Sequence, residues 1–112
     1  MDPSELGVMN MSEILRIERV VAEFNVWLGE TLPFAKMKVK VLEQNGTGYL
    51  AITNLHVLNK SSREPEYISG LGATVDDALK DVLSWFVQIV QRNATERGFN
   101  EADFAWSAPE DF

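Results

Sequence analysis

His56 is the only histidine in this 112-residue chain, and it is the first candidate for acid–base or nucleophilic chemistry. A serine–histidine–aspartate site would need it beside a serine, of which the candidates are Ser61, Ser62, Ser69 and Ser84. None of these serines lies in the glycine-flanked turn that exposes a nucleophile. With no cysteine in the chain, thiol catalysis is excluded as well. We therefore predict no catalytic residue and no enzyme, an expectation that a deep pocket holding His56 and a carboxylate would challenge.

A glycine-containing stretch, "GLGATVDDALKD", could hold a phosphate or a metal ion, because two glycines precede a helical pattern and three aspartates, Asp76, Asp77 and Asp81, open it. A dinucleotide site needs a third glycine where Val75 stands, and Asp76 and Asp77 would repel a phosphate. These two carboxylates instead complement the positive end of a helix, and Thr74 with Asp77 forms a variant capping box. We predict no metal site and no cofactor.

Three lysines, Lys36, Lys38 and Lys40, alternate with apolar residues and would form a row on one face of a strand. Such a row could contact phosphates, which makes nucleic-acid binding the alternative function. The charge distribution argues against it: the net charge is −7, and residues 12–98 balance all 10 Lys and Arg residues against 11 of the 17 acidic ones. Nucleic-acid binders usually carry a clustered basic face instead.

The C-terminal stretch 99–112 combines carboxylates with aromatic side chains and contains no Lys or Arg. Aromatic residues spaced among acids are typical of a segment that docks on a partner protein. The alternative, which we favour, is that Phe99, Phe104 and Trp106 fold back onto the sheet. The candidate partner-binding residues are Phe99, Phe104, Trp106 and Phe112.

The elements that would position these residues can be predicted from periodicity. Apolar residues at spacings of three and four predict a helix over 12–28, ended by Gly29, and a second helix over 75–93. Strict alternation in "FAKMKVKVLEQ" predicts a strand, Asn45-Gly46 predicts a hairpin turn, and "YLAITNLHVL" predicts the return strand. "EYISGLGA" predicts a short third strand. The fold class is therefore α+β, a two-layer α-β-β-β-α arrangement with a three-stranded antiparallel sheet packed against two helices.

We expect three parts along the chain: a flexible leader over 1–11, a single α+β domain over 12–98, and the acidic, aromatic tail over 99–112. No apolar run approaches the roughly 20 residues of a membrane span. The absence of cysteine agrees with a reducing compartment, so we expect a cytoplasmic protein that does not contact membranes.

The predicted order of elements resembles the double-stranded-RNA-binding domain over about residues 12–93. In that family a lysine-rich motif at the start of the second helix contacts phosphates; aligned by Ala78, the chain reads "VDDALK", with Asp76 and Leu79 where lysines are expected. The resemblance therefore implies the fold without the basic RNA-binding motif. A second, local resemblance is to HicB-type antitoxins, which place a similar T-x-x-E-A-L helix start after strands.

The leading functional hypothesis is a small non-catalytic interaction protein that acts through protein–protein contacts. Its partner would be another protein or a second copy of the chain, because a three-stranded sheet leaves an edge open.

Overall fold

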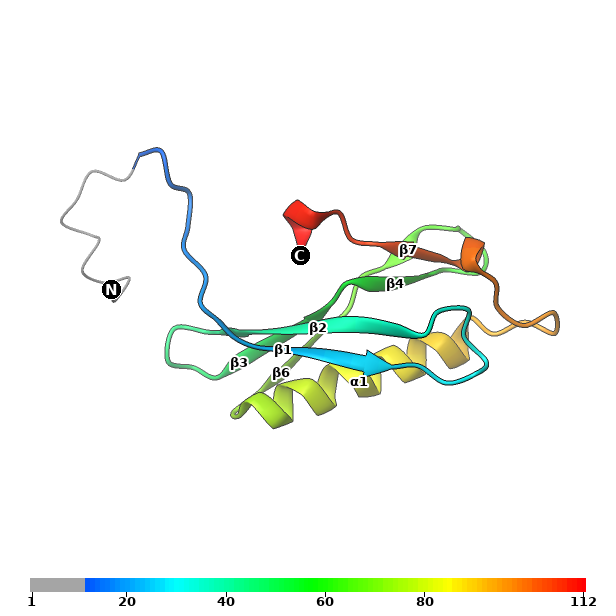
Figure 1. Cartoon of the computed structure of the whole chain (residues 1–112), viewed down its shortest axis with the longest axis horizontal. Coiled ribbons are helices and arrows are strands. Elements are labelled where there is room, and N and C mark those ends of the chain that lie inside the picture. The colour runs from blue at the N-terminus through cyan, green and yellow to red at the C-terminus, as the bar shows by residue number, and fades with distance from the viewer. Residues whose placement is uncertain (1–11) are drawn as a thin grey trace.

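The computed structural model describes residues 12–112 and confirms a mixed α+β fold, with one α-helix and two antiparallel sheets (Figure 1). The larger sheet has the strand order β1-β2-β3-β6, and the smaller has the order β5-β4-β7. The elements are β1 (Val20–Trp27), β2 (Lys36–Glu43), β3 (Tyr49–Thr53), β4 (Leu55–Leu58), β5 (Pro65–Glu66), β6 (Ser69–Gly72), α1 (Val75–Arg92), β7 (Phe104–Trp106) and two short 3₁₀ turns, Glu101–Asp103 and Pro109–Asp111.

The predicted helix over 12–28 is wrong, and with it the layout of two helices on three strands. Residues 14–19 have no regular secondary structure, and β1 pairs antiparallel with β2 from Val20 to Trp27. The apolar residues fit the period of a strand as well as that of a helix, because Ala22, Phe24 and Val26 alternate with exposed neighbours. Valines and aromatic residues favour a strand, and pairing with β2 decides between the two.

The predicted hairpin is confirmed. β2 and β3 pair in the register Glu43↔Tyr49, and the turn residues Asn45 and Gly46 have positive φ angles of 33° and 76°. Met37, Val39 and Val41 are buried on one face of β2 as the alternation predicts.

The predicted return strand is divided at Asn54, where the two sheets separate. Asn54 donates its backbone N–H to the carbonyl of Lys38 (3.1 Å), accepts the N–H of Lys38 on its side chain (2.8 Å) and accepts the N–H of Ser107 on its carbonyl (2.8 Å). One asparagine therefore joins the middle of β2 to the end of β7, and the chain continues into the second sheet as β4. The predicted third strand is also divided, into β5 and β6.

The predicted second helix is confirmed as α1, with Thr74 accepting the backbone N–H of Asp77 (3.1 Å) as its N-terminal cap. α1 packs chiefly on β6 and β3 and contacts β2 less. Gly70 and Gly72 make this packing close, because a Cβ on Gly70 would lie 2.3 Å from the backbone nitrogen of Val82. The glycines thus allow the helix to lie directly on the β6 backbone.

The segment after α1 folds back onto the protein. β7 pairs with β4 in the register Val57↔Phe104, and the Phe104 ring contacts the rings of Phe34 and Phe99 at centroid distances of 5.6 and 5.5 Å. Phe104 is buried in the core. Within residues 12–112, no helix combines the length and the apolar character needed to cross a membrane.

Candidate functional site

The outer edge of β1 is the longest edge left without a partner strand among the described residues. Leu28 donates its N–H to Ala35 (2.8 Å), so the alternation of an antiparallel pair directs the backbone groups of Val26, Phe24 and Ala22 towards β2. The intervening residues Glu23, Asn25 and Trp27 then direct their N–H and C=O groups to the open edge. They are exposed, and the Trp27 side chain is 70% accessible.

The other sheet edges are short or capped. At β6 the backbone N–H of Leu71 donates to the Asp81 carboxylate of α1 (2.9 Å), which occupies a donor that another strand would need. β5 has two residues, the first of them Pro65, and β7 has three. Natural sheets protect their edges by such means, whereas β1 carries no Lys, Arg or Pro along its length.

The side chains of β1 that point towards α1 are only partly covered. Ala22, Phe24 and Val26 pack against the core cluster, yet each remains half-buried. The corresponding residues of β2, Met37 and Val39, are almost fully buried. The apolar core therefore extends to the open edge.

The lysine row lies next to β1 on the face of the larger sheet away from α1, and each lysine has a partner within the chain. The Lys36 ammonium lies 5.1 Å from the centre of the Trp27 ring, and Lys38 forms a 3.4 Å ion pair with Glu23. Lys40 donates to the carbonyl of Phe112 and lies 4.4 Å from its ring centre. Phosphates would have to displace these contacts, and nucleic-acid binding stays a prediction.

The four aromatic residues proposed for partner binding lie in different environments. Phe104 is buried and Phe99 is half-buried against it, so both contribute to the core. Trp106 is 47% exposed and contacts Phe34 with a centroid distance of 5.0 Å. Phe112 is half-buried over Lys40. These rings do not form one continuous exposed patch.

His56 borders a cavity of about 640 Å³ between the two sheets, whose polar lining includes Ser107 and Asp111 and whose aromatic lining includes Tyr67 and Trp106. The His56 Nε2 atom lies 2.5 Å from the Ser107 hydroxyl oxygen, and burial lowers the pKa of the imidazole. A pocket lined by both the histidine and a carboxylate is thus present. Sequence reasoning considered other serines and missed Ser107, which only the pairing of β4 with β7 brings to His56.

The chemistry open to this cavity is limited by the second nitrogen of His56. Its Nδ1 atom is buried without a hydrogen-bond partner in the described part of the chain. In a serine–histidine–acid site a carboxylate binds that nitrogen, fixes the tautomer and stabilises the imidazolium. Among the described residues, the part-buried pair of His56 and Ser107 lacks this orienting group.

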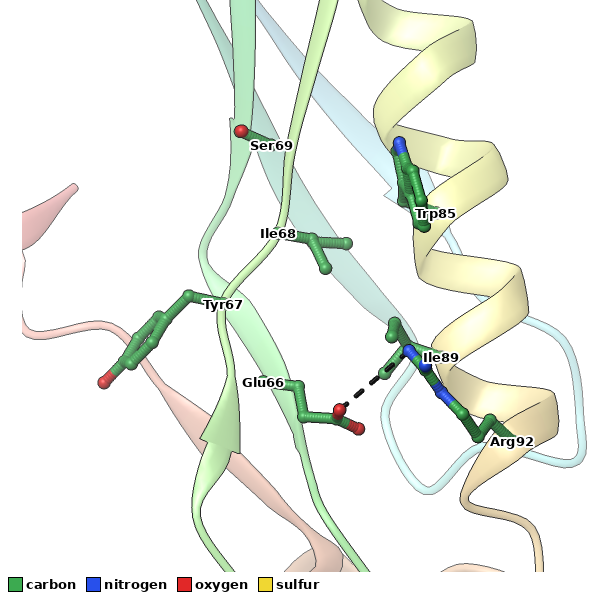
Figure 2. Close-up of a pocket in the computed structure, with 7 residues that line it drawn as sticks. All are labelled: Glu66, Tyr67, Ile68, Ser69, Trp85, Ile89 and Arg92. Atoms are coloured by element: carbon green, nitrogen blue, oxygen red, sulfur yellow. Dashed lines mark ion pairs between the residues drawn. The ribbon is translucent and has the colours of Figure 1, made fainter.

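A second hollow, of about 390 Å³, lies between α1 and the segment that joins β5 to β6 (Figure 2). Ile68 points towards Trp85 and Ile89 of the helix, whereas Tyr67 points to the other side of the segment. An ion pair of 3.9 Å between Glu66 and Arg92 lies at one end. The hollow has apolar walls but no convergent set of polar groups.

The three aspartates at the start of α1 have structural roles that the geometry shows. Asp77 supplies its N–H to the cap, Asp81 binds the β6 edge, and Asp76 adds negative charge to the first turn. Among residues 12–112 no cluster of three metal-ligating side chains could hold an ion.

Comparisons of the chain with protein-family models, with curated proteins and with solved structures found no significant match. The resemblances to double-stranded-RNA-binding domains and HicB-type antitoxins therefore stay predictions. The first of them relied on a helix over 12–28, where the structure has the strand β1 from Val20 to Trp27 and no helix.

Proposed function

We propose that this chain is a non-catalytic interaction protein that binds another polypeptide along the edge of β1. The observation that carries the proposal is the long edge of β1, which has no partner strand among the described residues and is flanked by half-buried apolar side chains. An extended segment that pairs there gains main-chain hydrogen bonds and buries the edge of the apolar core. The cavity at His56 favours catalysis less, because no described residue binds the Nδ1 atom of the imidazole.

Site-specific photocrosslinking in cells of the organism whose genome encodes the chain tests this proposal. The photoreactive amino acid p-benzoylphenylalanine would replace Trp27 at the β1 edge, and a matched control would carry it in place of Trp85, an exposed tryptophan on α1. We expect a discrete protein adduct from position 27 and none from position 85.

Blocking the edge should remove the adduct. Asn25→Pro deletes an N–H that points away from β2, so the existing sheet keeps its hydrogen bonds while a docking strand loses one. Asn25→Ala keeps the N–H and serves as the matched control. The proposal fails if position 27 yields no adduct, or if its adduct persists in the Asn25→Pro background.

A further inference from the structure

We infer that the strand that docks on β1 is β1 of a second copy, so that two larger sheets join into one across a two-fold axis at Phe24. This inference rests on the proposed function and names its partner. In an antiparallel pair of identical strands the same surface serves both subunits, and the interface closes on itself. The capped β6 edge opposes the alternative of head-to-tail addition of β1 to β6.

Backbone geometry restricts the register of the two β1 strands. Only residues whose N–H and C=O groups point to the open edge can form the hydrogen-bonded pairs, and these are Glu23, Asn25 and Trp27. Three registers remain near the middle of the strand: Glu23 opposite Glu23, Glu23 opposite Asn25, or Asn25 opposite Asn25.

Charge and packing select the second register. The first places two carboxylates directly opposite each other, which destabilises a cross-strand pair. The third places Glu23 opposite Trp27 and shortens the overlap. The second opposes Glu23 with Asn25, a carboxylate that can accept from an amide, and it opposes Ala22 with Val26 and Phe24 with Phe24 on the core side.

The selected register also accounts for the half-buried residues of β1. Ala22, Phe24 and Val26 of one copy would continue into the same row of the other, so each copy covers the edge of the other's apolar core. The irregularity of pairing between Val20 and Ala22 lies at the end of this overlap, where Trp27 of one copy would face Val21 of the other, and the pairs from Ala22 to Val26 do not include it.

Disulfide trapping tests both the partner and the register, because the chain has no native cysteine. Two variants, Glu23→Cys and Asn25→Cys, would be purified separately and then oxidised alone or as an equal mixture. In the selected register these positions face each other across a hydrogen-bonded pair, at a Cα separation of about 5.5 Å that a disulfide can bridge.

We expect a covalent dimer in the mixture and little in either variant alone. A dimer from Glu23→Cys alone, or from Asn25→Cys alone, would assign another register and overturn the inferred one. Sedimentation of the full chain should show a mass that rises with concentration towards twice that of the chain, and Asn25→Pro, unlike Asn25→Ala, should lower the dimer's affinity at least tenfold.

A chain that stays monomeric at every concentration and gives no trapped dimer overturns the inference. The photocrosslinking result then separates it from the proposed function: an adduct at position 27 of a mass other than twice the chain leaves the proposed function standing with a different partner. No adduct at position 27 ends both.

Discussion

Replacing Gly70 with alanine tests whether α1 lies directly on the backbone of β6. An ideal Cβ at this position would lie 2.3 Å from the backbone nitrogen of Val82 and 2.6 Å from the carbonyl oxygen of Ala78, where ordinary contact begins at 3.4 Å. Both atoms belong to the helix backbone, so no side-chain rotation relieves the overlap. The helix would have to move away from the sheet by about 1 Å.

The cost of that movement should be large for a single methyl group. Ala78 and Val82 are fully buried at the contact, and their packing would be lost along with that of the neighbouring turn. Overpacking in a core usually costs about 1–3 kcal/mol. Because the new Cβ is fixed to the strand backbone and meets backbone atoms of the helix, we expect the upper end, a decrease of about 3 kcal/mol in the free energy of unfolding.

Urea unfolding followed by tryptophan fluorescence measures this decrease as a shift of the transition midpoint at unchanged slope. Gly29→Ala is the matched control, because its Cβ would meet nothing within 4 Å and its backbone does not adopt a positive φ. A loss below about 0.5 kcal/mol for Gly70→Ala, or equal losses for the two variants, would refute the close packing of α1 on β6.

Three further predictions concern capping and titration. Asp103 binds Arg97 (2.6 Å) and the backbone N–H of Asn100 (2.9 Å), which lowers its pKa from 3.8 to about 2. The carboxyl of Asp103 takes up a proton more readily in the unfolded chain, so its contribution to stability is present above about pH 4 and is lost as the pH falls towards 2. Allowing for the half-exposed arginine, Asp103→Asn should lower the free energy of unfolding by about 1–2 kcal/mol at pH 7. Urea titrations at several pH values should also show that the variant's stability depends less on acid pH. Burial lowers the pKa of His56 below 6.5, so stability should fall as the pH drops below about 6.5, with a slope of at most about 1.4 kcal/mol per pH unit, and His56→Gln should abolish that slope. Thr74→Ala removes the acceptor for the Asp77 N–H and should cost about 1 kcal/mol in thermal or urea unfolding, whereas Thr74→Ser should be close to neutral.

The sequence was sufficient to predict those elements of the fold in which local chemistry and the final structure agree. α1 begins at its predicted cap, and the Asn45-Gly46 turn brings β2 and β3 into register. At these positions a hydrogen bond between near neighbours, or a positive φ angle, fixes the conformation before any distant contact forms.

The His56 cavity and the protection of the β6 edge, which leaves β1 as the open edge, could not be predicted to the same extent, because distant pairings create them. His56 and Ser107 are 51 residues apart, and the pairing of β4 with β7 brings them together. The bond between Asp81 and the β6 edge likewise needs the final packing of α1. The segment from Asn100 to Asp103 did carry a local signal, since an acceptor and an acid three residues apart form the capping box that is present there.

The misassigned segment explains why an edge remains open. An α-helix with its side chains is about 10 Å wide, and neighbouring strands lie about 4.8 Å apart, so one helix covers roughly two strands. α1 covers β6 and β3, which leaves β1 at the margin of its layer. Had residues 12–28 formed a helix, they would have covered the sheet; as β1, part of that segment widens it instead. The apolar side chains of β1 therefore lack the cover that a second helix would supply. The same change of structure leaves the outer backbone of β1 without a partner strand among residues 12–112, and this is the edge that the proposed function uses.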